Sequence, residues 1–393
     1  MKEKNIGNRL QIDPTSLKQK IDNGEDIFIL DVRTPEEYKS WKMSYDRYKD
    51  LTLIPIDQLS SSDALEQIPK DKEIVTICAL GNRSMMAANL LTQLGYNAKS
   101  LTGGMSAWNK VFDIVIIPVK TRIPVKIWQI RRISKGCMGY IVASEIDKNA
   151  VVIDPNCHIN EAFIKVVKEN DLHINAVIDT HMHADHVSAV TSLARKLGTV
   201  VRISSMEGYD ITNNRNDGLT FDKIKDEDKI KVGDGFVLNA IHTPGHTNGS
   251  MCFSLDGTKD DDSKYVFTGD TIFIDEIGRP DLHGKAEEFT QNLYETYQQK
   301  ILKLPNKIVI LPAHFRGRFE QQKPIFNTLE SIKTEIKALS LNKVEFVELV
   351  SRSIPPQPIN HRRILKINKS MIPCNEIQIE DLEDGPNSCG IRP

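Results

Sequence analysis

Apolar runs and helical segments alternate along the first part of the chain, residues 10–112. Buried strands are predicted at 26–31 (DIFILD) and 73–78 (EIVTIC), and helices at 35–41 and 83–94. Thr34 is a favourable N-cap for the first helix, and Met86 and Leu91 are predicted to share the apolar face of the second. Strands and helices in this order predict an α/β domain with a mainly parallel sheet covered by helices.

A second system of shorter segments begins near residue 125, after a linker at 113–124 that contains Pro118 and Pro124. Strands are expected at 140–144, 151–154, 176–180, 200–204, 236–242, 251–255 and 265–268, and helices at 159–170, 187–197 and 286–302. This content predicts an αββα sandwich over 125–345, with two sheets inside and helices outside. Residues 346–393 are expected to form an irregular tail that packs on this second domain.

Composition narrows the class of protein. The chain has 393 residues, and at roughly 150 residues per domain this length predicts two or three domains. Lys and Arg total 51 against 53 Asp and Glu, so the basic excess of a nucleic-acid-binding protein is missing. The aliphatic stretch at 114–119 is far shorter than the ~20 residues that span a bilayer. We therefore expect neither nucleic-acid nor membrane binding, and homo-oligomerisation stays open.

The cysteines and the start of the chain predict a compartment. The first ten residues, MKEKNIGNRL, lack the apolar core of a secretory signal. The cysteines form no C-x-x-C pair, and a chain of this length does not need a disulfide framework. We therefore expect all six to be reduced, in a cytoplasmic protein, with Cys137 and Cys252 serving packing. The six stand at positions 78, 137, 157, 252, 374 and 389.

Cys78 stands where a thiol can act as a nucleophile. It ends a predicted strand, and the residues that lead into the next helix are Ala79, Leu80, Gly81, Asn82, Arg83 and Ser84. The loop N–H groups, the positive end of the helix and the Arg83 guanidinium all favour the thiolate, which predicts catalytic roles for Cys78 and Arg83. A thiol at a strand end is also a common packing residue, so the spacing alone leaves both interpretations open.

Three segments carry a family resemblance for the first domain. Residues 31–38 (DVRTPEEY), 78–84 (CALGNRS) and 101–108 (LTGGMSAW) together resemble a rhodanese domain. The resemblance implies that Cys78 carries a persulfide sulfur held by the loop amides, since a six-residue loop is typical of sulfur-transferring members. Residues 41–52 (WKMSYDRYKDLT) depart from the family pattern at the border of the pocket, which leaves the sulfur acceptor open.

The densest group of metal-binding side chains follows a predicted strand of the second domain. Residues 180–186 (THMHADH) place three histidines and an aspartate in one turn, and further candidates follow at later strand ends. Imidazole and carboxylate groups are ligands for zinc, iron or manganese. Strand ends of a rigid scaffold can direct side chains from distant parts of a chain to one site. The candidates are His181, His183, Asp185, His186, His246, Asp270 and His314.

These motifs resemble the metallo-β-lactamase superfamily over residues 125–345, which implies the αββα fold and a metal site. Two metal arrangements are open. In a two-zinc hydrolase similar to glyoxalase II, one ion takes His181, His183 and His246, the other takes Asp185, His186 and His314, and Asp270 bridges them. In the alternative, one iron(II) per chain takes His181, His246 and Asp270 and keeps three positions open, while the other four residues orient ligands and water.

Three features favour a single iron. Residues 277–282 (IGRPDL) resemble a segment of persulfide dioxygenases, which implies that Arg279 and Asp281 contact the substrate; a structural ion pair between the two is the alternative. The tail segments 355–368 and 383–389 resemble bacterial members of that group, and the glutathione-binding domain of glyoxalase II is missing. A sulfur-transfer domain is also a logical neighbour for a persulfide-oxidising site.

The resemblance thus predicts an enzyme with two sulfur activities. One is iron-dependent oxidation of a thiol persulfide, such as glutathione persulfide, by dioxygen to sulfite and thiol; the other is sulfur transfer through Cys78 that forms or uses thiosulfate. The alternatives are a two-zinc thioester hydrolase with a regulatory rhodanese module, and a rhodanese module that only docks or senses persulfide. His283 is a further pocket candidate, whereas the histidines at 158, 173 and 361 are expected at the surface or in the tail.

Overall fold

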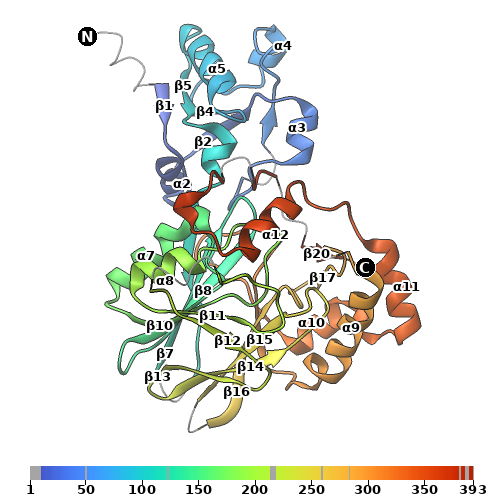
Figure 1. The fold of residues 1–393 in the computed structure, drawn as a ribbon. Coiled ribbons are helices and arrows are strands. Elements are labelled where there is room, and N and C mark those ends of the chain that lie inside the picture. The colour runs from blue at the N-terminus through green and yellow to red at the C-terminus, as the bar shows by residue number, and fades with distance from the viewer. Residues whose placement is uncertain are drawn as a thin grey trace.

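The first domain is a five-stranded sheet with helices packed on it, as predicted (Figure 1). The computed structural model describes residues 10–48, 51–121, 124–212, 218–257, 260–282, 284–379, 382–385 and 389–392. The strand order is β1-β5-β4-β2-β3, and every pairing is parallel. The strands are β1 (Gln11–Ile12), β2 (Ile27–Asp31), β3 (Thr52–Leu53), β4 (Glu73–Ile77) and β5 (Asn97–Leu101). The helices are α2 (Pro14–Asp22), α3 (Pro35–Ser40), α4 (Ser62–Leu65), α5 (Asn82–Gln93) and α6 (Gly104–Trp108).

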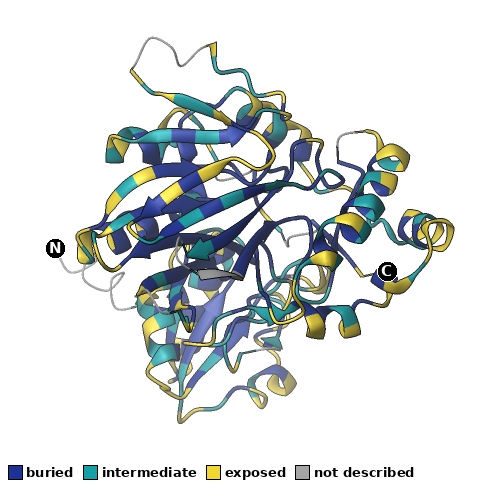
Figure 2. Ribbon diagram, turned by 90° about the horizontal axis from the view of Figure 1, so that it is seen from below, coloured by how far each residue is buried: buried dark blue, intermediate teal, exposed yellow. Residues whose placement is uncertain are grey.

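The second domain is an αββα sandwich, which confirms the predicted fold class. Its first sheet has the order β12-β11-β10-β9-β8-β7-β6 and its second the order β13-β14-β15-β16-β18-β19. The first sheet contains β6 (Phe112–Ile116), β7 (Val125–Arg132), β8 (Cys137–Ser144), β9 (Asn149–Ile153), β10 (His173–Ile178), β11 (Val200–Ser204) and β12 (Phe221–Ile224). The second contains β13 (Lys229–Gly233), β14 (Phe236–His242), β15 (Met251–Gly257), β16 (Asp260–Gly269), β18 (Val309–Pro312) and β19 (Asn327–Thr328). The strands are largely buried, and exposed positions gather on the outer helices and turns (Figure 2). The outer helices are α7 (Asn160–Glu169), α8 (Val190–Leu197), α9 (Ala286–Gln299), α10 (Leu329–Glu335) and α11 (Lys343–Ser353).

Packing overrides the hydrophobic pattern in β7 and α5. Strand β7 was not predicted, because it contains two arginines. Both side chains, Arg131 and Arg132, are nevertheless fully buried and paired with carboxylates. Helix α5 buries Ala87, Ala88 and Leu91 on the sheet, whereas Met86 is 64% exposed. Small side chains let this helix lie close to β4 and β5, so the predicted burial of Met86 is wrong.

The two domains are joined by an extensive contact. Strand β6 pairs antiparallel with β7, so part of the expected linker is an edge strand of the second domain. Asp113 in β6 accepts a hydrogen bond from Lys18 of the first domain (3.0 Å) and pairs with Arg131 of the second. One apolar cluster includes Trp108 of the first domain and Phe319 of the second. The junction is therefore a packed interface.

The tail is more regular than expected. It contains α11, α12 (His361–Lys369) and β20 (Gly390–Ile391), and β20 pairs with β17 (Ile277–Gly278) of the second domain. Short 3-10 turns lie at Cys157–Ile159, Ile301–Lys303, Lys337–Ser340 and Cys374–Glu376. Helix α12 lies near the junction of the two domains (Figure 1). Within the described residues, no helix is long and apolar enough to cross a membrane.

A disulfide ties the tail to the sandwich, which corrects the expectation that all cysteines are reduced. Cys157 and Cys374 are bonded, with their Cα atoms 5.6 Å apart, while Cys78, Cys137, Cys252 and Cys389 are free. The partners are 217 residues apart in sequence. Local spacing rules cannot detect such a pair, because it is the fold that brings the two segments together.

Reduction of this disulfide is expected to destabilise the protein. A crosslink that closes so long a loop lowers the entropy of the unfolded chain and typically contributes about 2–4 kcal/mol. Dithiothreitol should therefore lower the thermal unfolding midpoint of the wild-type protein by several degrees. Cys374→Ala should unfold at the reduced midpoint and no longer respond to dithiothreitol. An equal response of wild type and Cys374→Ala would contradict a stabilising disulfide.

Candidate functional site

Cys78 lies in the loop between β4 and α5 and is 1% exposed. Its Sγ accepts the N–H of Gly81 at 3.1 Å and lies 3.4 Å from Oγ of Ser84. Gly81 has a φ of 97°, a left-handed conformation that favours glycine, and it turns the chain into α5. At Gly104 an added Cβ would lie 2.2 Å from the carbonyl oxygen of Cys78. The main chain thus wraps closely around the thiol.

The predicted neighbours of Cys78 differ in what they contact. Ala79 and Leu80 lie at the outer side of the loop, and Leu80 is 65% exposed. Asn82 is the first residue of α5. The Arg83 guanidinium donates to both Glu37 oxygens (2.8 and 2.6 Å), and this pairing lowers the Glu37 pKa to about 2. Arg83 therefore braces α5 against α3, where Glu37 also completes the helix cap at Thr34.

Three of the seven histidine and aspartate candidates form one compact group. His181 follows β10, His246 lies between β14 and β15, and Asp270 follows β16. Their ligand atoms lie within 4.8 Å of one another. Nε2 of His181 and Nε2 of His246 are 3.6 and 3.5 Å from the same oxygen, Oδ2 of Asp270. We call this group the metal triad.

The surroundings of the metal triad orient its ligand atoms. Oγ1 of Thr180 donates to Asp154, so it accepts from Nδ1 of His181 at 2.9 Å. Nδ1 of His246 donates to the carbonyl oxygen of Arg279 at 2.8 Å. Each ring therefore presents Nε2 to Asp270. A hydrogen bond at the other ring nitrogen commonly fixes the orientation of a metal-binding histidine in this way.

Unsatisfied buried atoms mark where an ion fits. Among the described residues, Nε2 of His181 and Oδ2 of Asp270 are buried without a hydrogen-bond partner, as are ring nitrogens of the nearby His183 and His186. Buried polar atoms rarely stay unpaired. Two imidazole nitrogens and a carboxylate oxygen are a donor set that fits iron(II), so the residues present suit a metal ion.

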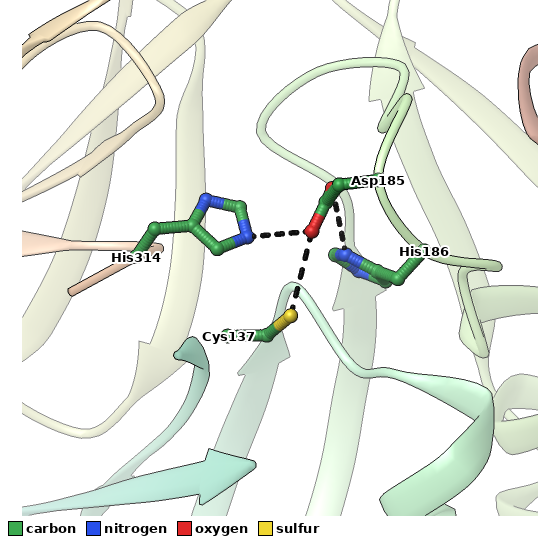
Figure 3. Close-up of side chains that lie close together, drawn as sticks. All are labelled: Cys137, Asp185, His186 and His314. Carbon is green, nitrogen blue, oxygen red and sulfur yellow. Dashed lines mark hydrogen bonds and ion pairs between the residues drawn. The ribbon is translucent and has the colours of Figure 1, made fainter. Parts of the chain in front are cut away.

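A second group adjoins the first through His314. Nδ1 of His314 lies 2.5 Å from Oδ1 of Asp270, and its Nε2 lies 2.9 Å from Oδ2 of Asp185. Asp185 also contacts Nδ1 of His186 (3.0 Å) and the Sγ of Cys137 (3.4 Å), as Figure 3 shows. Burial would raise the pKa of Asp185, but His186 and His314 hold it well below its usual range. These four residues form a second set of possible ligands.

His183 belongs to neither of these groups. Its Nε2 lies 3.3 Å from Oδ1 of Asp154 and 3.6 Å from Oδ1 of Asp179. Burial alone would lower the pKa of His183, but hydrogen bonding to the two carboxylates raises it well above its ordinary value. The three residues form a separate cluster. The His183 ring still contacts the rings of His181 and His186, with both centroid distances 4.2 Å, so it is the direction of its Nε2, toward Asp154 and Asp179, that differs from the two-zinc arrangement.

Arg279 and Asp281 form the ion pair that the sequence left as an alternative to substrate contact. The Arg279 guanidinium is fully buried and donates to both Asp281 oxygens (2.7 and 2.9 Å) and to the carbonyl of Pro355 (2.7 Å). Gln357 donates to the Asp281 carbonyl. The pair therefore anchors the tail segment beside the site. His283 lies outside the described residues.

Two residues that shape the site lie in the tail segments 355–368 and 383–389, but no individual role was predicted for them. The Asn368 side chain in α12 donates to the carbonyls of His183 and His186, both at 2.8 Å. Glu383 is fully buried, pairs with Arg132 and accepts the N–H of Val187 at 2.6 Å. These contacts brace the histidine-rich loop from the tail, and only the fold could have pointed to them.

The surroundings of two cysteines and one histidine also differ from those predicted. Cys137 and Cys389 were not predicted near the metal ligands, yet each lies in a group with His314. His158 was expected at the surface, but its side chain is 1% exposed, near Glu383. Burial lowers the His158 pKa to about 2, so this ring is neutral.

Comparisons with known proteins agree with the two-domain fold. A model of the metallo-beta-lactamase superfamily matches residues 135–314, and a model of the rhodanese-like domain matches residues 13–111. Persulfide dioxygenase ETHE1, mitochondrial, of Bos taurus is 31% identical over 227 residues, which cover 57% of this chain and 80% of the relative. The chain belongs to the metallo-β-lactamase superfamily and carries an N-terminal rhodanese-like domain.

Other members of this superfamily are about as similar. A probable polyketide biosynthesis zinc-dependent hydrolase, BaeB, of Bacillus velezensis is 30% identical over 184 residues, 47% of this chain and 75% of the relative. Among solved structures, a metallo-beta-lactamase from Staphylococcus aureus has 28% identity and a TM-score of 0.57, covering 64% of this chain and 74% of the other. Identity alone therefore does not choose between oxidation and hydrolysis.

Proposed function

We propose that this protein is a persulfide dioxygenase with an attached sulfurtransferase. The second domain would oxidise a low-molecular-weight thiol persulfide, such as glutathione persulfide, with dioxygen and water to thiol and sulfite. The first domain would carry sulfane sulfur on Cys78 and exchange it with thiosulfate. The observation that carries the proposal is the metal triad, in which Nε2 of His181 and Nε2 of His246 face one oxygen of Asp270, whereas Nε2 of the adjacent His183 lies nearest Asp154.

The metal triad has the composition of an open iron site. Two histidines and one carboxylate on a six-coordinate ion leave three positions unfilled. When bound there, iron(II) supplies redox chemistry with dioxygen and room for a sulfur ligand. The protein's part is to hold Nε2 of His181 and His246 toward Asp270 and to exclude bulk water, since all three residues are 1% exposed.

The neighbouring residues have supporting roles in this proposal. His314 links Asp270 to Asp185 and so fixes both carboxylates. Arg279 positions His246 through its carbonyl and holds the tail through its guanidinium. A direct contact of Arg279 or Asp281 with substrate is not needed. The similarity to persulfide dioxygenases and the fused rhodanese-like domain add support for the substrate class.

A two-zinc thioester hydrolase is the second candidate. The group of Cys137, Asp185, His186 and His314 favours it, because these side chains could hold a second ion. A zinc-dependent hydrolase is also among the relatives. This arrangement would require His183 to leave Asp154 and Asp179 and turn toward His181.

Metal analysis and oxygen uptake distinguish the two candidates. Full-length protein prepared without oxygen and supplied with iron should hold about one iron per chain. With glutathione persulfide it should consume one dioxygen for each sulfite released, since that is the stoichiometry of the reaction. Two zinc ions per chain, together with thioester hydrolysis and no oxygen uptake, would establish the hydrolase instead.

A further inference from the structure

A cavity of about 450 Å³ lies at the junction of the two domains. Its wall includes Ala79 and Leu80 of the Cys78 loop on one side and Asp185 of the second metal-binding group on the other. Trp41, Lys135 and the tail segment 356–359 complete it. We call this cavity the chamber. It is the size of a site for a small organic molecule, which commonly spans about 300–1,000 Å³.

The walls of the chamber are fixed by contacts between the domains and the tail. Nε1 of Trp41 donates to the carbonyl of Ser134 in the second domain (3.1 Å). Nζ of Lys135 donates to the carbonyl of Glu383 in the tail (2.9 Å). Trp41 begins the segment 41–52, which departs from the rhodanese pattern, and this segment also reaches Phe319 through the N–H of Asp46 (2.8 Å). The unusual segment therefore builds the junction.

Two side chains, Asp185 and His314, lie between the chamber and the metal triad. Asp185 lies in the chamber wall, His314 contacts Asp185, and the other nitrogen of His314 contacts Asp270. On the opposite side, Ala79 and Leu80 are the two residues that follow Cys78. A molecule in the chamber thus contacts the loop that follows Cys78 and also Asp185 of the second metal-binding group.

We propose that the chamber holds one small thiol carrier, which receives sulfane sulfur from Cys78 and presents it to the metal triad without leaving the protein. This inference rests on the proposed function, and it adds a shared carrier site and a direction of transfer. The lining holds charges of both signs, Arg33 and Lys135 against Glu37, Asp185 and Asp384, which suits a carrier that, like glutathione, has both carboxylates and an amine.

The transfer step is balanced without an added oxidant. The carrier sulfur attacks the outer sulfur of the Cys78 persulfide, the bond between that sulfur and Cys78 breaks, and a new sulfur–sulfur bond to the carrier forms. Cys78 leaves as the thiolate, and the carrier's proton ends on the transferred sulfur. Thiosulfate reloads Cys78 by the same exchange and releases sulfite. The carrier persulfide is then oxidised as proposed above.

An isotope-trapping experiment on the full-length, iron-loaded protein tests this path. Cys78 is loaded from thiosulfate with labelled outer sulfur, and glutathione is added without oxygen. The sample is then mixed with oxygen and an excess of unlabelled glutathione persulfide. If the labelled carrier persulfide stays in the chamber, we expect an immediate burst of labelled sulfite that approaches one per chain. A label content equal to that of the mixed bulk pool would overturn the proposal.

Two variants, each expected to lack one of the two proposed activities, provide the comparison. When loaded Asp270→Ala is mixed with Cys78→Ser, labelled persulfide must cross the solution, so the unlabelled excess should suppress the burst severalfold. The proposed function is tested separately: if the wild type without thiosulfate makes no sulfite from added glutathione persulfide, the dioxygenase activity fails. If it makes sulfite in that test but shows no labelled burst in the trapping experiment, the shared carrier site alone fails.

A variant in the chamber wall gives a readout that does not depend on turnover. Ile359 lines the chamber and is 83% exposed, whereas Ile146 is 57% exposed at a distant turn. Ile359→Trp should narrow the chamber, reduce the burst and slow alkylation of Cys78 by a bulky maleimide in metal-free protein severalfold. Ile146→Trp should match the wild type in both measurements. Equal behaviour of the two variants counts against the chamber as the route.

Discussion

Asp270→Ala is expected to deplete the protein of iron and to lower oxygen uptake with glutathione persulfide by more than ~100-fold. Asp270 supplies the only carboxylate of the metal triad, and its Oδ2 faces both histidine nitrogens. Its other oxygen holds His314. Even a residue that merely supports a metal ligand typically changes affinity by about 10–100-fold, so loss of the ligand itself should have a larger effect.

The measurement is iron per folded chain, followed by oxygen uptake and sulfite yield. Asp222→Ala is a matched control, because the half-buried Asp222 in β12 pairs with Arg202 and belongs to none of the metal-binding groups. Such a surface pair contributes little to stability, about 0–1 kcal/mol, so this variant should keep its iron and its activity. Asp270→Ala protein that retains a full iron content would contradict the assigned ligand set.

The candidate ligands could be predicted because histidines and aspartates occur in short motifs at strand ends. Residues 180–186 and the later strand ends contain all three members of the metal triad. What the sequence could not decide is which histidine faces which partner. The rings of His181 and His183 are in contact, with centroids 4.2 Å apart, yet Nε2 of His183 is directed to Asp154 and Asp179, which follow β9 and β10. That distribution depends on side-chain directions that only the folded chain defines.

Features that join distant segments were the ones missed. The Cys157–Cys374 disulfide, the contacts of Asn368 with the histidine-rich loop, and the buried Glu383 all connect the tail to the sandwich. Each depends on a single tail residue whose partner is far away in sequence, so even the family resemblance of segments 355–368 and 383–389 did not predict the contact. Strand β7 was also missed. The charges of Arg131 and Arg132 do not suit a buried strand unless their carboxylate partners are known.

Cys78→Ser is expected to abolish thiosulfate-linked sulfur transfer while leaving oxygen uptake with added glutathione persulfide within about twofold of wild type. A hydroxyl cannot form the persulfide, because the thiolate is the nucleophile in sulfur exchange. Cys78 belongs to the first domain, whereas every member of the metal triad comes from the second. Serine is nearly the same size, so the hydrogen bond from Gly81 and the packing of the loop should survive.

The two activities must be measured on the same preparation to make this result decisive. Cys252→Ser is the matched control, because Cys252 is another fully buried free thiol, in β15 of the second domain. It should retain sulfur transfer, which would show that loss of any buried thiol does not stop the reaction. Mass analysis of intact protein after thiosulfate treatment should find one added sulfur on wild type and Cys252→Ser, and none on Cys78→Ser. If Cys78→Ser still transfers sulfur, the rhodanese-like loop is not the sulfur carrier. If Cys78→Ser loses both sulfur transfer and oxygen uptake, the two domains do not act as separable centres.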